Sequence, residues 1–240
     1  MNLRLFVVHG SHPCATVEKA LQLKGLPYTV WEWPPPLHAP AQRLMTGQRT
    51  VPALRINCEM IAGSRPILHR LDELSPDPPL YPADPEDYRR VEEADRWGDA
   101  TFQPIPRELI WAGVKLRPEA LVTYGKTSRI PLPAAAVRLS APLVARAECR
   151  LNRTDEHIAR QRLTELPAHL DRIDAWLTDG TLNGAERPNG ADLQILSTVR
   201  LLGTIGDVRP LLEGRPSDAA ARRLWPEVDG DLPAGIFAAA

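Results

Sequence analysis

The sequence lacks the features that mark membrane-spanning, secreted and nucleic-acid-binding proteins. No run approaches the ~18 apolar residues of a transmembrane helix, and the apolar run at residues 3–8 is too short for a signal-peptide core. The 29 basic and 30 acidic residues leave a net charge of −1, so no general attraction to nucleic acid or an anionic membrane is expected. These absences favour a cytoplasmic protein.

Cysteine is scarce, which excludes a disulfide framework. The three cysteines, Cys14, Cys58 and Cys149, are odd in number and far apart, and their spacing matches no metal-ligand motif. We therefore expect no metal cofactor, and a reducing compartment fits the composition.

Proline is abundant, with 25 residues, roughly twice the usual share. A proline-rich stretch at residues 75–82 predicts a stiff linker. Before it, strand-like and helix-like segments alternate, and after it only helical patterns occur. The sequence therefore predicts two domains, residues 1–76 and 84–240.

The first domain is expected to have the order β-α-β-(α)-β-β-α. Its last two strands flank Asn57-Cys58, which reads as a two-residue hairpin turn. The first strands need a helical crossover to pair in parallel. The expected strands are 3–8, 28–33, 53–56 and 59–61, and the expected helices are 16–26, a short irregular one at 43–45, and 67–74.

The second domain has clear helix signals. Asp84-Pro85 combines a capping carboxylate with proline at the first helical position. Pro104 and Pro106 are expected to kink or end the helix that follows, and Pro167 to bend or restart a later one spanning 163–177. Another helical region is expected at 133–151. Asn189 and Asp192 have the spacing of a capping box before a mostly apolar helix at 189–202, so a structural role for Asp192 is expected.

The segment "GSHPCATV" at residues 10–17 joins the first strand to the first helix. Free N–H groups and the helix dipole favour an anion at such a helix start. Ser11 is therefore either a helix cap or a donor to an anionic ligand. In "TVPAL", the proline after Val51 is either a candidate cis bond or an ordinary strand-initiating proline.

These motifs occur in the order seen in one family. "TGQRTVPAL", "GLPYTVWEW" and "AGSRPILHRLDEL", with the segment 182–192, make the chain resemble the cytosolic glutathione transferases over nearly its whole length. The first of these looks especially like the glutaredoxin-related branch. The resemblance implies an α/β thioredoxin-like N-terminal domain followed by an all-α C-terminal domain.

The resemblance also implies roles at the turn. Ser11 stands where serine-type classes have the hydroxyl that hydrogen-bonds the glutathione sulfur and stabilises its thiolate. Cys14 matches the second, resolving cysteine of glutaredoxins, and is read either as reactive or as an inert, inward-facing thiol.

Further residues are implied to hold the thiol. Val51, turned outward by Pro52, offers its backbone to an extended peptide. Ser64, assisted by Arg65, matches the serine that binds the γ-glutamyl carboxylate. The family usually has glutamate or glutamine just before that serine, and Gly63 lacks the side chain, which leaves room for a related thiol instead of glutathione. Candidates for the glycyl carboxylate are Gln48, Arg43 and, alternatively, Arg49.

The function implied is a transferase that activates glutathione as co-substrate against a small hydrophobic electrophile, with a homodimer as the implied assembly. His9 and His12 flank the turn and can touch a ligand. Trp97, Trp111 and Tyr124 belong either to the electrophile pocket or to the core. Two other functions stay open: a thiol–disulfide or deglutathionylating enzyme using Cys14, and a non-catalytic protein that binds a ligand or partner.

Overall fold

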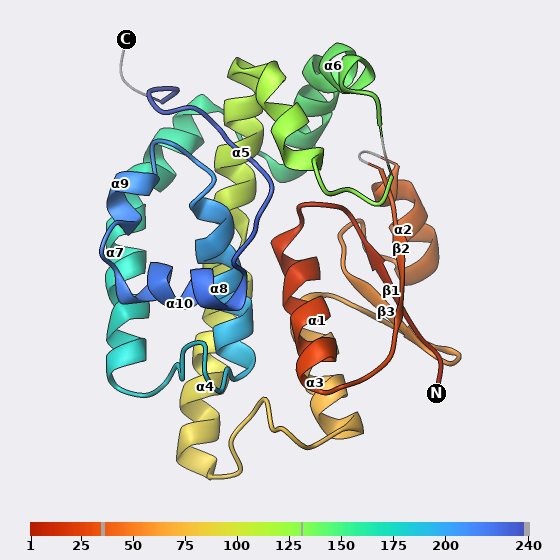
Figure 1. Ribbon diagram of the computed structural model, residues 1–240, viewed down its shortest axis with the longest axis vertical. Helices are drawn as coiled ribbons and strands as arrows, with labels where there is room; N and C mark the ends of the chain where they lie inside the picture. Colours follow the sequence, from red (N-terminus) through yellow and green to blue (C-terminus); the bar gives the residue numbers. More distant parts are fainter. Residues whose placement is uncertain (35–36, 131, 238–240) are drawn as a thin grey trace.

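The structure is a computed structural model that describes residues 1–34, 37–130 and 132–237. Its first part is a four-stranded mixed sheet with helices, and the rest is helical (Figure 1). The elements of the first part are β1 (Leu3–Val7), α1 (His12–Leu23), β2 (Thr29–Glu32), α2 (His38–Thr46), β3 (Ala53–Ile56), β4 (Glu59–Ala62) and α3 (Ser64–Leu74). This arrangement confirms the expected thioredoxin-like fold.

The sheet has the order β2-β1-β3-β4 and is centred on β1. Leu5 of β1 lies opposite Val30 in parallel β2 and opposite Leu54 in antiparallel β3. The parallel pair requires the crossover helix α1, whereas β3 and β4 are joined by the expected tight turn, with Asn57 at φ 54°. Four of the five β1 residues are buried, as expected for the central strand.

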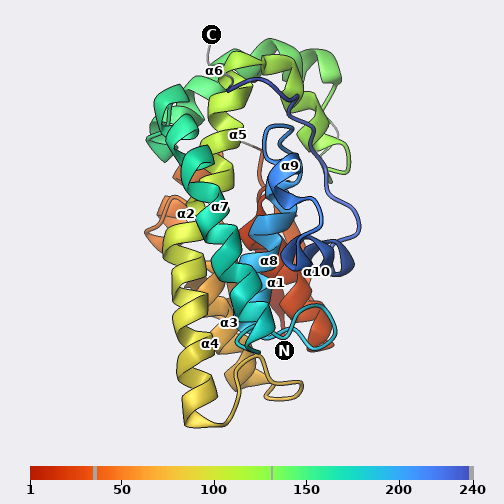
Figure 2. The same cartoon turned by 90° about the vertical axis from the view of Figure 1, so that its left-hand side faces the viewer.

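The helical part follows the linker. Its elements are α4 (Pro85–Trp97), a π-helical turn η1 (Gly98–Phe102), α5 (Pro104–Leu116), a 3-10 segment η2 (Pro118–Gly125), α6 (Ala134–Asn152), α7 (Glu156–Thr178), α8 (Gly190–Leu202), α9 (Arg209–Leu212) and α10 (Pro216–Leu224). Figure 2 looks onto this part, with the long helices α4, α5 and α7 in front. It confirms the expected all-α C-terminal fold. Among the described residues, no helix is both long and apolar enough to span a membrane.

Some helix boundaries differ from the expected ones. α1 begins at His12, because Pro13 is tolerated in the first turn, where its missing N–H leaves no bond unmade. α7 runs through Pro167 without a break, since tertiary packing outweighs the local penalty. α4 ends at Trp97, before the prolines. There Gly98 lies so close to α8 that an added Cβ would stand 2.7 Å from Ile195 Cγ1.

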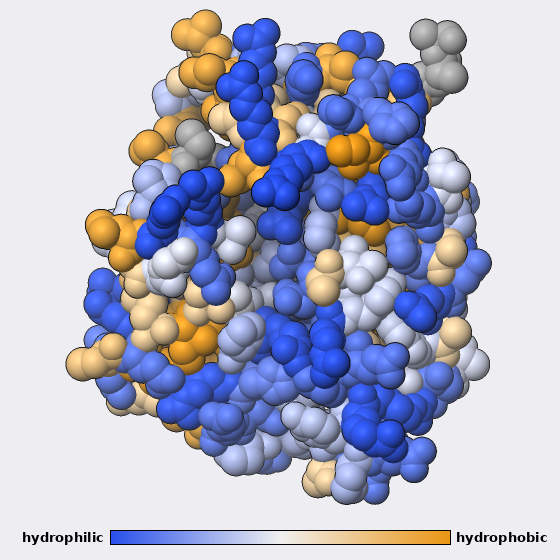
Figure 3. All heavy atoms as spheres, turned by 180° about the vertical axis from the view of Figure 1, so that it is seen from behind, coloured by the Kyte–Doolittle hydropathy of each residue, from blue (hydrophilic) through white to orange (hydrophobic). Residues whose placement is uncertain are grey.

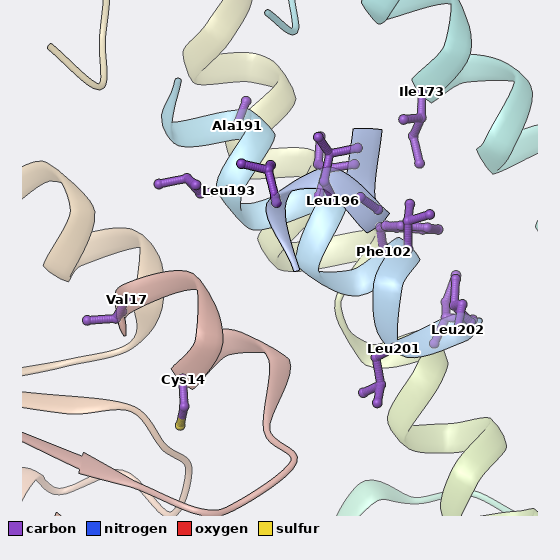
Figure 4. Close-up of a cluster of buried hydrophobic side chains, with 14 of the residues drawn as sticks. Cys14, Val17, Phe102, Ile173, Ala191, Leu193, Leu196, Leu201 and Leu202 are labelled. Atoms are coloured by element: carbon purple, nitrogen blue, oxygen red, sulfur yellow. The ribbon is translucent and has the colours of Figure 1, made fainter. Parts of the chain in front are cut away.

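α8 is the centre of the helical core. Twelve of its thirteen residues are buried, and Figure 4 shows several of them, among them Leu193 and Leu196, near Phe102 and Ile173. The expected capping box is present: Asn189 Oδ1 accepts from the Asp192 N–H (2.9 Å), and Asp192 Oδ2 accepts from the Asn189 N–H (2.9 Å). Asp192 also accepts backbone N–H bonds from Asn183 and Gly184, which anchors the preceding loop.

The two parts of the chain are joined through α1. Thr16 on α1 is fully buried, and its hydroxyl donates to the Leu193 carbonyl oxygen (3.1 Å) and contacts the Ser197 hydroxyl (2.8 Å), both on α8. Lys24, just after α1, donates to Asp72 Oδ1 (2.8 Å) and to two linker carbonyls. The Thr16 bonds hold the first half of α1 against the helical part, and the Lys24 bonds hold its end against α3 and the linker. The candidate site lies at the start of α1.

Candidate functional site

The site is built on the turn where β1 ends and α1 begins. Ser11 is the N-cap residue, with extended backbone (φ −76°, ψ 112°), and its carbonyl oxygen accepts from the N–H groups of Cys14 and Ala15. Its hydroxyl, however, makes no capping hydrogen bond to the helix. A half-buried hydroxyl without a capping bond therefore stands at this helix start, next to the Cys14 thiol.

A cavity of about 720 Å³ opens beside this turn. It lies between the start of α1 and the helical segments α5, η2 and α6; in Figure 1, the start of α1 lies below the green stretch that contains η2. Ser11, His9, His12 and Val51 line it on the sheet side. The apolar lining on the helical side includes Ile110, Trp111, Leu121, Tyr124, Val137 and Val144.

Of the aromatic residues considered from the sequence, two line this cavity. These are Trp111 on α5 and Tyr124 on η2. Trp97 instead stacks on Phe102 (ring centroids 5.3 Å) and meets the edge of Trp176, so it belongs to the helical core. Sequence spacing alone did not separate these cases.

Cys14 lies in the first turn of α1 and faces inward. Its side chain is buried, and Figure 4 shows it pointing away from α8. Burial raises the pKa of the Cys14 thiol to about 12, although hydrogen bonding by the Ser11 hydroxyl and the Val8 backbone opposes the rise. At neutral pH the group is a protonated thiol, and a thiol is a poor nucleophile.

The Val51-Pro52 peptide bond is cis, as the sequence indicated. Among the described residues, the backbone N–H and C=O of Val51 have no hydrogen-bond partner, and Val51 lines the cavity. The Pro52 carbonyl oxygen accepts from the Gly63 N–H (2.9 Å), which brings the start of α3 beside this backbone. Ser64, the first residue of α3, is buried, and within the described chain its hydroxyl has no partner.

Gly63 has a structural reason to be glycine. It precedes α3 with φ 91°, a left-handed conformation that a side chain disfavours. The backbone conformation at position 63 therefore disfavours the glutamate or glutamine that was expected from the resemblance. The groups that the start of α3 offers to a carboxylate are the Ser64 hydroxyl and backbone N–H groups.

Pro52 and Ser64 are not among the residues that line the cavity, and the remaining sequence candidates do not line it either. Arg65 is turned toward α4, where it forms ion pairs with Glu92 and with Asp95 (Nε–Oδ2 3.2 Å). Arg65 was expected to contact a ligand carboxylate, whereas the structure pairs it with two carboxylates of α4. Gln48 and Arg43 are exposed near the end of α2, as is Arg49, and their expected role toward a glycyl carboxylate stays a prediction.

Glu92 and Asp95 also belong to a cluster of side chains that could hold a metal ion. His69, Glu92 and Asp95 place ligand atoms within 4.8 Å of one another. Arg65 already supplies a cation to both carboxylates, and Tyr81 donates a hydrogen bond to Asp95 Oδ2 (2.9 Å). The arrangement is an ion-pair cluster that joins α3 to α4.

Two polar contacts at the cavity were not visible in the sequence. His9 Nε2 lies 2.9 Å from Asp229 Oδ2, and the same oxygen accepts from the Thr127 N–H, so the C-terminal segment is attached next to Ser11. His12 Nε2 lies 3.1 Å from the Gln103 carbonyl oxygen, an acceptor, so this nitrogen carries the proton. Burial, and secondarily Arg107, lower the pKa of His12 well below its usual value, which keeps the ring neutral.

α5 and α6 also bring charged groups to the cavity. Arg107 and Glu108 of α5 and Glu148 of α6 line it, although nothing in the local sequence pattern distinguished them from surface residues. Glu108 pairs with Arg162 (Oε2–Nε 2.6 Å). Arg107 and Glu148 have no such partner among the described residues, and they make this part of an otherwise apolar cavity polar.

Comparison with known proteins agrees with this architecture. Residues 5–79 match the family model for the glutathione S-transferase N-terminal domain. A comparison with curated proteins gives no match.

Several solved structures are similar over most of the chain. A β-etherase from Sphingobium sp. strain SYK-6 has a TM-score of 0.66 at 16% identity, covering 92% of this chain and 93% of that one. A glutathione S-transferase from Sinorhizobium meliloti 1021 has a TM-score of 0.62 at 19% identity (99% and 98% covered). One from Populus trichocarpa has 0.60 at 17% identity (93% and 91% covered). These likenesses show a shared fold over most of the chain, and the family match shows that residues 5–79 are similar to the glutathione S-transferase N-terminal domain.

Proposed function

We propose that this protein is a glutathione transferase-like enzyme in which Ser11 stabilises the thiolate of glutathione, or of a related thiol, for attack on a small hydrophobic electrophile. The reaction is an addition, a displacement or a thiol-assisted isomerisation. The observation that carries the proposal is the Ser11 hydroxyl, which is free of any capping bond at the start of α1 and lines the cavity.

The physical argument starts from the thiol pKa. A hydrogen bond from the Ser11 hydroxyl and the positive end of the α1 dipole both favour the thiolate over the thiol. A charge-assisted hydrogen bond contributes about 1.5–3 kcal/mol, which corresponds to one or two pKa units. The bound thiol then supplies a nucleophile at neutral pH, and the cavity holds the electrophile beside it.

Two further groups suit the peptide part of glutathione or of a related thiol. The unpaired backbone of Val51 supports pairing with an extended peptide. The unpartnered Ser64 hydroxyl at the start of α3 suits a carboxylate, because the free N–H groups of a helix start favour an anion. Together with Ser11, these groups fit a short peptide whose thiol reaches α1 and whose carboxylate reaches α3.

The alternative based on Cys14 has less support. A thiol–disulfide or deglutathionylating enzyme needs a reactive thiolate, whereas the Cys14 thiol is buried and its pKa is raised to about 12. A non-catalytic protein that only binds a ligand shares the same cavity with the proposed enzyme. Thiol binding and turnover separate these two.

The test is a calorimetric titration with glutathione and other low-molecular-weight thiols. We expect saturable binding of glutathione or a related peptide thiol, weakened in Ser64→Ala, while Ser140→Ala on the α6 side of the cavity binds like the wild type. Turnover is then measured with a panel of apolar electrophiles. The panel includes an aryl ether, because one similar structure is that of a β-etherase. Absence of thiol binding would contradict the proposal.

A further inference from the structure

The cavity beside Ser11 contains a half-buried cation, Arg107, that forms no ion pair among the described residues. Arg107 lines the cavity from α5, and its Nη2 donates to Gln103 Oε1 (2.9 Å). Its Nε is buried and has no hydrogen-bond partner, and within the described ranges no carboxylate oxygen lies within 4.0 Å of its guanidinium. Burial of a guanidinium without an opposite charge is unfavourable unless an anion joins it.

The acids near Arg107 are engaged elsewhere or held apart from it. Glu108 pairs with Arg162, and Asp99 Oδ1 accepts from Gln194 Nε2 (3.1 Å). Glu148 is 4% exposed, and its Oε2 accepts a hydrogen bond from Asn152 (3.3 Å). None of the three neutralises the Arg107 guanidinium.

Glu148 is a second unusual group in the same cavity. In the part of the chain that the structure describes, its Oε1 is buried without a hydrogen-bond partner, although its side chain lines the cavity. Burial raises the pKa of Glu148, because it disfavours the carboxylate form. The cavity therefore has a polar group on α6 as well as the guanidinium on α5.

The rest of the helical wall is apolar, including Ile110, Trp111, Leu121, Val137 and Val144. A ligand that fits this wall has an apolar body, and a ligand that satisfies Arg107 has an anionic end. The planar fork of an arginine matches the two oxygens of a carboxylate.

We propose that Arg107 determines substrate specificity by binding a carboxylate carried by the electrophile. The substrates are then carboxylic acids that have an apolar body, either ring-containing or aliphatic, and an electrophilic carbon. This proposal rests on the proposed function for the reaction, but not for the binding. Gln103 orients the guanidinium through its own side chain, while its carbonyl oxygen holds His12 at the start of α1. The carboxylate is thus bound near the thiol, which places the reacting carbon within the apolar part of the cavity.

The test compares one reactive group with and without the negative charge. The probes are chlorodinitrobenzoate and its methyl ester as electrophiles, and dinitrobenzoate and its methyl ester as non-reactive ligands. For the wild type we expect a preference for the acid over the ester in both kcat/KM and Kd. In Arg107→Met the acid-to-ester ratio is expected to fall about 10–100-fold, the effect of losing charge-assisted hydrogen bonds.

Two variants serve as controls. Arg107→Lys keeps the charge but loses the fork, so an intermediate ratio is expected, and it keeps the test valid if Arg107→Met does not fold. Arg117→Met removes an exposed arginine at the end of the same helix and is expected to leave the ratio as in the wild type. Thermal unfolding confirms that each variant is folded.

The outcomes separate this inference from the proposed function. Tighter binding of dinitrobenzoate than of its ester, dependent on Arg107, supports the inference even if no thiol transfer is detected. Transfer to the ester and the acid with equal efficiency overturns the inference and leaves the transferase intact. A rise in the pKa of the bound thiol in Arg107→Met, with acid and ester affected alike, also overturns it, because Arg107 then acts on the thiolate.

Discussion

At the scale of single residues, Ser11 carries the largest share of the proposed chemistry. Ser11→Ala is expected to lower turnover about 10–100-fold with little loss of fold stability, because one charge-assisted hydrogen bond to the thiolate is removed while no capping bond is broken. The pKa of the bound thiol, read from thiolate absorbance against pH, should rise by one or two units. Identical titration curves for wild type and Ser11→Ala would reduce Ser11 to a structural residue.

Cys14 is expected to be unreactive at neutral pH. With its pKa raised to about 12 by burial, its thiolate fraction at pH 7 is more than about 1,000-fold below that of a free cysteine of pKa ~8.5. Incubation with a thiol-alkylating reagent, followed by mass spectrometry, measures this. Cys58 is exposed in the β3–β4 turn and serves as the internal control, because it should be labelled first.

Labelling with oxidised glutathione extends this test to the alternative function. A mixed disulfide located at Cys14, together with activity lost in Cys14→Ser and retained in Ser11→Ala, would make Cys14 the catalytic residue in place of Ser11. A lone active cysteine can attack a disulfide but cannot resolve the product internally, so the adduct would persist long enough to be detected.

At the scale of elements, α8 depends on the capping box at its start. Asp192 is fully buried and accepts backbone N–H bonds from Asn183 (2.9 Å), Gly184 (2.8 Å) and Asn189 (2.9 Å). Asp192→Ala leaves three backbone donors without partners, two of them buried and one part-buried, at about 1 kcal/mol or more each, so a loss of about 3–5 kcal/mol is expected in chemical denaturation. Asn189→Ala removes the reciprocal cap and should lose only about 1 kcal/mol. Equal effects of the two substitutions would contradict this account.

Helices α2 and α6 present apolar residues to solvent. Leu44 on α2 and Leu139 and Leu143 on α6 are among the most exposed large hydrophobic side chains. Figure 3 shows orange side chains gathered on its upper left, the side on which α2 and α6 lie when the molecule is seen from behind. Since α6 also walls the cavity, this exposed surface lies on the outside of the candidate site.

At the scale of the whole molecule, we expect a two-fold dimer. The hairpin and α3 around residues 65–70 are expected to meet residues 89–97 of the partner, as the family resemblance implies. Light scattering should then give about twice the 26.6 kDa mass of one chain. A mass near that of one chain at micromolar protein would remove the expectation.

A charge substitution locates the expected interface. Arg89 is exposed on α4 within the proposed contact, and Arg223 is exposed on α10, outside it. Arg89→Glu is expected to shift the equilibrium toward the monomer, whereas Arg223→Glu should leave the mass unchanged.

The same preparations permit limited proteolysis at residues 77–83, which tests the predicted division into domains 1–76 and 84–240.

The sequence determined those features whose signals are local. The apolar run that begins at Leu3 forms a core strand, Asn57-Cys58 closes a tight turn, and Asn189 and Asp192 cap a helix, because each of these depends on residues close together in the chain. The order of these elements led to the fold and to Ser11 at the start of α1. The restart considered at Pro167 does not occur, because α7 continues through this residue.

Only the tertiary structure decided what surrounds Ser11. His9 meets Asp229 across 220 positions of sequence, and Arg65 turns to Glu92 rather than toward the cavity. Arg107 and Glu148 share one cavity although they lie on different helices. Charge pairing and burial depend on distances in space, which the packing of α5, η2 and α6 against α1 sets, and no periodicity along the chain encodes them. The sequence therefore pointed to Ser11, where we propose that a thiol is activated, and the packing determined which groups line the cavity beside it.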